Sequence, residues 1–333
     1  VAHNSLLIKD PNETMPSGIV NSGGQRRPGG EKGTFSAWMS SGYDTGTVLD
    51  YAYDEINIVP SYSYIKGDIT RAYSDKVSEV VRSMMFIPLS DTEHPAALIV
   101  MDKVTSTNPT FVKTWLLHTQ QDFTISGTTA IIKRDTDGYN GRMDLTTLLP
   151  ANATYTKIGG VGNEFNINGI NYPPESMGNN GCERGLYRLE VSPSSANATD
   201  YFLNVMQVST ASANANPLNA ELIETDLLAG VKIYDRVAVF GKNKARMNGT
   251  ISFNVPGTEI SGLKVTVAGA SEGTWYVYKD SDLLCTADAT SDGGIIFFEG
   301  GAGSYIVTKG AISNIVTRFS SATPTVALAT PVS

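Results

Sequence analysis

Short runs of β-branched and aromatic residues recur along most of the chain, separated by glycine, asparagine, aspartate and proline. Runs of this kind are typical of strands, and the separating residues are typical of turns. Stretches with helical spacing are almost absent. The pattern therefore predicts an all-β chain, with clear strands expected at 96–104, 110–119, 123–133, 185–191, 201–208, 230–240, 263–267, 274–278 and 304–307.

The turn pattern favours antiparallel sheets. Residues 135–138 and 291–294 have the composition of hairpin turns, in which glycine supplies the positive φ. Strands joined in this way bury their apolar faces by stacking or closing their sheets. A change of composition near 242–248 and an Ala/Thr/Pro/Ser/Val-rich end suggest three parts. We predict a large antiparallel β-sandwich over 1–245, a smaller β unit over 246–320 and a linker-like tail over 321–333.

Composition excludes some classes of function. Of 333 residues, 41% are hydrophobic and 17% are charged, which is typical of a globular protein with ample material for a core. The net charge of −8, with no block of like charges, argues against a nucleic-acid partner. A local basic cleft could still bind an anionic sugar. No apolar run reaches the roughly 18 residues of a membrane-spanning helix, so we expect no membrane partner.

Cysteine usage leaves the redox state open, because Cys182 and Cys285 show no zinc-type spacing and could be paired or free. Few cysteines and lysines, together with much glycine, serine, threonine, asparagine and tyrosine, favour a secreted or periplasmic bacterial protein.

The chain has three histidines, and two of them flank apolar runs. His3 opens one run and His118 closes another, with Asp68 between them in sequence. Two imidazoles and a carboxylate with an open position suit Zn²⁺ and, less selectively, Mn²⁺ or Fe²⁺. No local spacing links the three residues, so the alternative is that His118 hydrogen-bonds at a strand end and Asp68 opens a turn. His94 stands in a polar turn, where we expect it to be exposed.

Other chemistry has weaker support. Any of the 15 tyrosines could act as an acid or base, or stack on a sugar ring, but strand packing is the commoner role. Arg26 and Arg27 could clamp a carboxylate or sulfate, or could simply be solvated. The string GASEG at 269–273 joins two strand-like runs, which favours a hairpin loop over a nucleophile elbow. The residues alone identify no catalytic group.

The order of several segments resembles the β-sheet portion of the heparinase II/III-like polysaccharide lyases. The resemblance covers 2–208, and the remaining third of the chain resembles the family only loosely. The matching segments are 2–8, 62–73, 76–88, 98–104, 115–118, 147–150, 159–165, 188–193 and 202–205.

This resemblance implies a division of labour between two domains. Such enzymes join an N-terminal α/α toroid to a C-terminal antiparallel β-sandwich, with the active cleft between them, and cleave uronate-containing polysaccharides by β-elimination. The resemblance places a structural metal at His3, Asp68 and His118, with zinc first and manganese or calcium as alternatives. Most catalytic groups would come from the toroid. Val1 stands where some members have a catalytic histidine, so the catalytic residues are unknown.

We therefore expect the β-sheet half of a polysaccharide lyase that acts, with a toroid domain of the same protein, on an anionic polysaccharide such as alginate or a glycosaminoglycan. One alternative is a non-catalytic carbohydrate-binding β-module, which predicts an empty metal site and sugar binding along exposed tyrosines. The other is a uronate epimerase on the same scaffold, which would abstract the same proton without cutting the chain.

Overall fold

The computed structural model describes residues 3–26, 33–39, 43–54, 58–173, 185–212 and 216–312. Over these ranges the secondary structure is almost entirely strand, which confirms the predicted all-β fold. The helical elements are one turn each, α1 (Phe35–Trp38) and the 3₁₀ turn η1 (Thr70–Ala72). Within the described ranges, no helix has the length and apolar character needed to cross a membrane.

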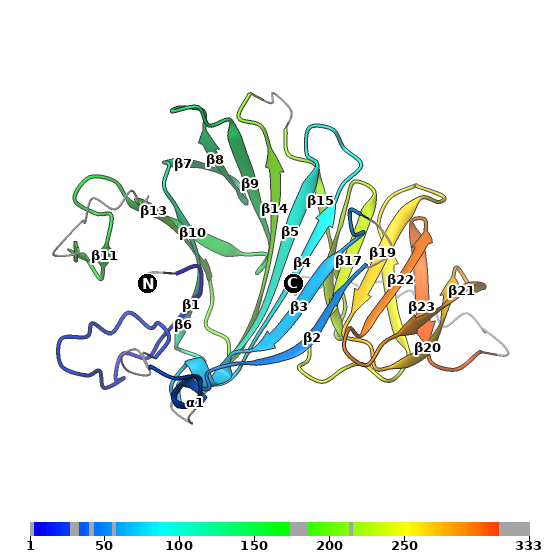
Figure 1. Cartoon of the computed structure of the whole chain (residues 1–333), viewed down its shortest axis with the longest axis horizontal. Coiled ribbons are helices and arrows are strands. Elements are labelled where there is room, and N and C mark those ends of the chain that lie inside the picture. Colours follow the sequence, from blue (N-terminus) through cyan, green and yellow to red (C-terminus); the bar gives the residue numbers. More distant parts are fainter. Residues whose placement is uncertain are drawn as a thin grey trace, which may run out of the picture.

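Two antiparallel sheets form the first part of the molecule (Figure 1). The N-terminal sheet has the strand order β1 (Leu6–Lys9), β6 (Val112–Thr119), β13 (Tyr187–Pro193) and β10 (Ala153–Gly159). The large sheet has the order β2 (Thr47–Tyr53), β3 (Ser63–Asp68), β4 (Val77–Pro88), β5 (Ala96–Ser106), β14 (Thr199–Ser209), β9 (Gly141–Leu149), β8 (Thr129–Arg134) and β7 (Phe123–Ser126). A small hairpin joins β11 (Asn166–Ile167) to β12 (Ile170–Asn171).

Two further sheets follow. The five-stranded sheet has the order β15 (Ala220–Glu224), β16 (Leu228–Ile233), β17 (Arg236–Gly241), β19 (Leu263–Ala268) and β22 (Ile295–Gly300). Its β17–β19 pair is parallel. The C-terminal sheet has the order β18 (Ile251–Val255), β23 (Gly303–Thr308), β20 (Gly273–Lys279) and β21 (Asp282–Ala289). The five-stranded sheet takes strands from both sides of residue 245, and the predicted domain boundaries stay a prediction.

The sheets stack as four layers with three buried cores between them (Figure 1). Each strand that lies between two layers buries both of its faces, which explains its continuous apolar character. Members of the first core, between the N-terminal and large sheets, are Leu6, Trp115, Leu145 and Phe202. The second core, between the large and five-stranded sheets, contains Met85, Ile99, Val231 and Phe240. The third contains Val239, Val267, Trp275 and Tyr305.

Three local expectations need correction. Residues 123–133 form a hairpin, β7 and β8, because Gly127 turns the chain with φ of 58°. Residues 230–240 form the hairpin β16–β17, which turns at Tyr234 with φ of 50°. His94 is buried, with 1% of its surface exposed, because its backbone N–H and ring Nδ1 both face the Asp91 carboxylate, at 2.7 and 3.2 Å. The predicted tail, Arg27 and Cys182 lie outside the described residues.

Candidate functional site

The large sheet has one face that is only partly covered. Because successive side chains of a strand point to opposite faces, Arg82, Met84 and Phe86 of β4 share a face, and Met85 and Ile87 point the other way into the second core. The N-terminal sheet covers the first face at Val80, yet Phe86 is 45% exposed. We call the uncovered part the open face, defined by Tyr51, Tyr53, Ile65, Met84, Phe86 and Leu98.

A buried ion pair lies where the covered region meets the open face. Arg82 donates from Nε and Nη2 to the two oxygens of Asp102 on β5, at 2.6 and 3.0 Å, and from Nη1 to the backbone oxygen of Asn4 at 2.8 Å. Asp102 is completely buried. Burial acts to lower the pKa of Arg82, but the Asp102 carboxylate outweighs it and the pKa is raised. Arg82 therefore ties β4, β5 and the segment before β1 together.

Asn4 also holds His118. The Oδ1 atom of Asn4 accepts the backbone N–H of His118 at 2.7 Å and lies 3.0 Å from its ring Nδ1. In the register between β6 and β13, His118 stands opposite Arg188. Arg188 is itself engaged by Glu190 at 2.8 Å and by the backbone oxygen of Asn166 at 2.9 Å. The His118 backbone and ring are thus fixed at the junction of the N-terminal and large sheets.

Asp68 belongs to a different part of the molecule. Asp68 follows Lys66 by two residues on β3, so both side chains point to the same face of the large sheet, opposite the open face. On that side the Nζ of Lys66 donates to the backbone oxygen of Asn243. The Asp68 carboxylate accepts from the N–H and Oγ1–H of Thr70, at 2.9 and 2.6 Å, and is paired with Lys244. Burial acts to raise the pKa of Asp68, but the hydrogen bonds from Lys244 and Thr70 prevail and the pKa is lowered.

Of the three predicted metal ligands, His3 and His118 are linked only through Asn4 in the described part of the chain. His3 is exposed and adjoins Asn4, which holds His118, whereas the Asp68 carboxylate is occupied by Lys244 and Thr70. Within the described ranges, no group of three or more His, Cys, Asp and Glu side chains is arranged to hold a metal ion. In this arrangement His3, Asp68 and His118 do not form a ligand set, and the metal site stays a prediction.

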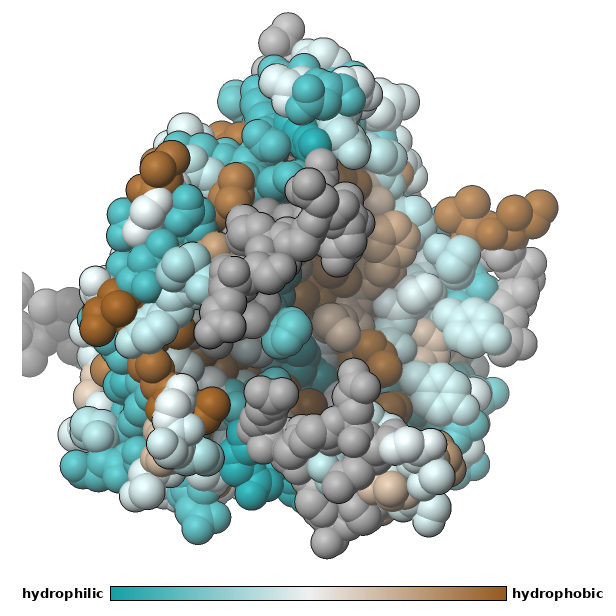
Figure 2. All heavy atoms as spheres, turned by 60° about the vertical axis from the view of Figure 1, so that its left-hand side comes forward, coloured by the Kyte–Doolittle hydropathy of each residue, from teal (hydrophilic) through white to brown (hydrophobic). Residues whose placement is uncertain are grey.

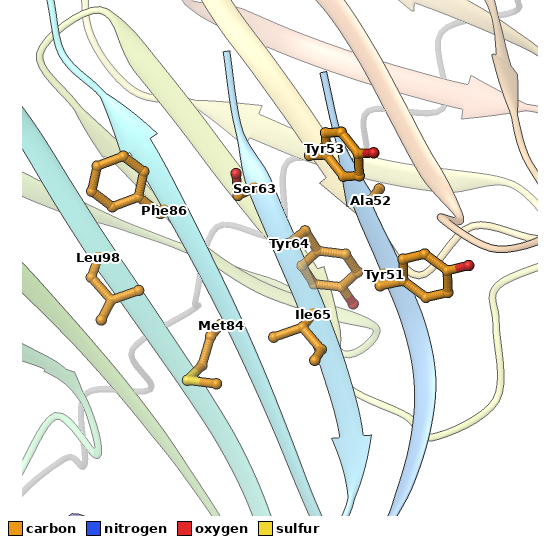
Figure 3. Close-up of a pocket in the computed structure, with 9 residues that line it drawn as sticks. All are labelled: Tyr51, Ala52, Tyr53, Ser63, Tyr64, Ile65, Met84, Phe86 and Leu98. Carbon is orange, nitrogen blue, oxygen red and sulfur yellow. The ribbon is translucent and has the colours of Figure 1, made fainter. Parts of the chain in front are cut away.

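An apolar pocket lies on the open face (Figure 3). It encloses about 410 Å³ and is lined by Tyr51, Ala52, Tyr53, Ser63, Tyr64, Ile65, Met84, Phe86 and Leu98. Tyr51 and Tyr53 are 53% and 55% exposed. Figure 2 shows this side of the molecule hollowed, with hydrophobic side chains in the hollow. Phe86 is four residues from Arg82 along β4, and this even spacing places the pocket and the ion pair on one face of the large sheet. At the usual rise of a strand the two residues are about 13 Å apart.

Sequence reasoning assigned no role to Asn4, Arg82 or Asp102. A signal for the pair does exist, because Arg82 follows two apolar residues and Asp102 follows the apolar run 96–101, and the two opposite charges face each other in the register between β4 and β5. Asn4 carried no signal of its own beyond its place next to His3.

Comparison with known proteins finds a similarity in the C-terminal part of the chain. Residues 222–309 match the family model of the heparinase II C-terminal domain. The match falls in the region where the sequence resemblance was loosest. A comparison with curated protein sequences finds no match.

Among solved structures, the chain is similar to a heparinase III, with 12% identity, a TM-score of 0.37, and coverage of 58% of this chain and 26% of that one. It is also similar to a mutant of the heparan sulfate lyase HepC from Pedobacter heparinus, with 10% identity, a TM-score of 0.36, and coverage of 59% and 29%. It is also similar to a heparinase III with methylated lysines, with 12% identity, a TM-score of 0.34, and coverage of 82% of this chain and 32% of that one. The chain spans a third or less of the length of these structures. Residues 222–309 are therefore similar to a heparinase II C-terminal domain.

Proposed function

We propose that this chain is the β-sheet portion of a polysaccharide lyase, of glycosaminoglycan-lyase type, that works together with an N-terminal toroid domain of the same protein. The match of residues 222–309 to the heparinase II C-terminal domain carries the proposal. The partly covered face of the large sheet supports it, since a second domain or a substrate could cover Tyr51, Tyr53 and Phe86. Alginate as an alternative substrate, and secretion or a periplasmic location, belong to the same proposal.

The proposed reaction is a β-elimination on a uronate. A base removes the C5 proton, the electron pair forms the C4–C5 double bond, and the bond between C4 and O4 breaks as O4 takes up a proton. Arg82 does not neutralise the uronate carboxylate in this scheme, because Asp102 already occupies its guanidinium through two hydrogen bonds. The part that we assign to this chain is to shape one wall of the cleft, and the base and acid are assigned to the toroid.

Ultraviolet absorbance of the unsaturated uronate tests the proposal. The chain alone and the full-length natural protein that contains it would each be mixed with alginate, heparan sulfate, chondroitin sulfate, hyaluronan and ulvan. We expect absorbance to rise on at least one polysaccharide with the full-length protein only. An absence of any rise with the full-length protein, while its fold is intact by circular dichroism, would overturn the proposal.

A second function, polysaccharide binding without cleavage, is favoured by one observation. Tyr51, Tyr53 and Phe86 expose aromatic rings around a concave apolar surface, and exposed rings can stack on sugars. Isothermal titration with the same panel would compare the Tyr53→Ala variant with Tyr139→Ala, which removes a similarly exposed ring, 51%, near the β8–β9 turn. Binding that weakens only in Tyr53→Ala, without cleavage by the full-length protein, would favour a binding module.

A further inference from the structure

A second cavity lies at one end of the five-stranded sheet. Its volume is about 570 Å³, and it shares no lining residue with the pocket of the open face. Sites for small ligands have volumes of roughly 300–1,000 Å³. The lining comes from the β4–β5 connection, β15, the β16–β17 hairpin and the segment before β19, and it includes Ser90, Glu221, Lys232, Tyr234, Asp235 and Glu259.

Lys232 places a buried hydrogen-bond donor in this lining. Its side chain is 8% exposed, and its Nζ lies 2.7 Å from Oε1 of Glu259 and 3.3 Å from Oε2 of Glu221. The second contact follows from the register, in which Glu221 of β15 stands opposite Lys232 of β16. Gly257 allows the close packing, because an added Cβ there would lie 2.8 Å from Nζ. Among the described residues these two carboxylates are the partners of Nζ, which leaves one of its three protons for a ligand.

The protonation state of this lysine is well defined. Burial acts to lower the pKa of Lys232, but the hydrogen bonds to Glu259 and Glu221 prevail and the pKa is raised. The cavity therefore presents a fixed ammonium donor next to carboxylate acceptors.

This arrangement favours an uncharged ligand. An anionic group would meet the carboxylates of Glu221, Asp235 and Glu259, and like charges repel. A cationic group would compete with the ammonium of Lys232 for the same two carboxylates. Two neighbouring hydroxyl groups meet neither obstacle, because one can accept from Lys232 while the other donates to Glu221.

Tyr234 adds an aromatic surface to the polar groups. It is 47% exposed and stands in the two-residue turn between Ile233 and Arg236 with φ of 50°. This backbone conformation is uncommon for a bulky residue, and strained residues cluster at ligand sites. The next residue, Asp235, anchors the turn, since its carboxylate accepts from Oγ–H of Ser90 at 2.7 Å. The ring of Tyr234 is thus held in the lining of a polar cavity, where it can stack on the apolar face of a sugar ring.

We propose that this cavity binds an uncharged saccharide, with Tyr234 stacked on a sugar ring, Lys232 donating to one hydroxyl and Glu221 accepting from its neighbour. The inference goes beyond the proposed function and does not depend on lyase activity, because no bond is formed or broken. The occupant also differs from the anionic polysaccharide proposed for the cleft.

Isothermal titration of the chain with uncharged hexasaccharides tests the proposal. The panel is maltohexaose, cellohexaose, mannohexaose and chitohexaose, with a hyaluronan hexasaccharide and hexalysine as charged probes. We expect at least one uncharged hexasaccharide to bind, and Tyr234→Asn and Glu221→Gln to weaken that binding roughly tenfold or more. Asparagine tolerates positive φ, so Tyr234→Asn should melt at the same temperature as the unaltered chain or higher.

Two control variants remove exposed rings elsewhere. Tyr139→Asn removes a ring that is 51% exposed, and Tyr53→Ala removes one from the open face. Both should leave the affinity for the uncharged hexasaccharide unchanged. The proposal is overturned if no uncharged hexasaccharide binds, or if binding weakens as much in Tyr53→Ala as in Tyr234→Asn. It is also overturned if Tyr234→Asn and Glu221→Gln affect only the binding of hyaluronan or hexalysine. A failure of the proposed lyase activity would appear separately in the absorbance assay, since these titrations require no cleavage.

Discussion

The Arg82–Asp102 pair offers a sharp test of how the open face is held together. In the variant Arg82→Met, the completely buried Asp102 carboxylate loses two charge-assisted hydrogen bonds, and the backbone oxygen of Asn4 loses one. Methionine keeps much of the length of the side chain, so the change removes charge more than volume. The variant therefore isolates the electrostatic part of the contact.

The expected loss is large because Asp102 has no exposure to water. Removing one partner of a buried ion pair costs about 3–5 kcal/mol of unfolding free energy. The Arg82 side chain is 17% exposed, which favours the lower half of that range. The matched control is Arg71→Met, since the Arg71–Asp44 pair is 2.8 Å long but its side chains are 53% and 45% exposed. Such a surface pair contributes about 0–1 kcal/mol.

A double variant and the pH dependence separate the charge from the packing. Arg82→Met with Asp102→Leu removes the buried charge and should recover most of the loss. Burial raises the pKa of Asp102, and in Arg82→Met no guanidinium opposes that shift. A folded-state pKa above the unfolded value of about 3.9 means that the folded variant binds the extra proton. Its stability should therefore rise relative to the unaltered chain as pH falls, and decline as pH rises through the shifted pKa.

Urea unfolding followed by tryptophan fluorescence measures these differences. The reasoning is refuted if Arg82→Met loses no more stability than Arg71→Met, or if the double variant is no more stable than Arg82→Met. A pH-independent loss would show that packing, and not the buried carboxylate, dominates the contact.

Three further predictions concern separate parts of the molecule. The pKa of Asp68 is lowered by its partners against the effect of burial, so its contribution is present above the unfolded pKa and disappears as pH falls through the folded pKa. Asp68→Asn should thus lose up to about 1 kcal/mol at pH 7 in urea titrations, given that Lys244 is 51% exposed, and the loss should shrink as pH falls below the unfolded pKa of about 3.9. Gly159→Ala should lower the melting temperature well beyond Gly138→Ala, because both glycines have positive φ but an added Cβ at Gly159 would lie 2.4 Å from a backbone oxygen. The metal prediction is checked by elemental analysis: a bound divalent ion that disappears in His118→Ala would support it, and its absence from the unaltered chain would refute it.

The fold was predictable wherever a strand's own composition decided its structure. The apolar run at 96–104 became β5, and 201–208 became most of β14, because both strands are buried between two layers. The hairpin at Tyr234 escaped prediction because tyrosine seldom adopts positive φ and the turn contains no glycine. His94 escaped prediction because its burial depends on the fold of the β4–β5 connection.

The site was less predictable because its residues meet only through long-range pairing. His3 and His118 lie near each other because β1 pairs with β6, as the register of Leu6 with Trp115 shows. Asp68 was predicted to bind the same metal ion as these two histidines. Its position along β3, however, points its side chain to the opposite face of the large sheet, where it pairs with Lys244. A shift of one residue moves a side chain to the other face, so ligand sets assembled from separate strands need the register as well as residue types.

The relation between residues 1–245 and the rest of the chain yields a final prediction. A fragment ending at residue 245 keeps β15, β16 and β17 but loses β19, the parallel neighbour of β17, and the whole C-terminal sheet. The side chains that pack against the lost sheets would then face water, and they are 0–3% exposed in the intact chain: Ile223, Leu228, Val237 and Val239. At about 1.5–3 kcal/mol for each side chain, the loss is roughly 6–12 kcal/mol, comparable to the whole stability of a typical domain.

We therefore expect the fragment 1–245 to aggregate or bind a hydrophobic dye, and the fragment 1–312 to stay soluble. The second core joins Phe240 and Val231 to Ile99 and Met85 of the large sheet, so unfolding of one part should expose the other. Calorimetry of 1–312 should accordingly give one cooperative transition. A soluble fragment 1–245 that melts cooperatively, or two separate transitions in 1–312, would instead support an independent domain boundary near residue 245, and would mean that the third core contributes little to the stability of the large sandwich.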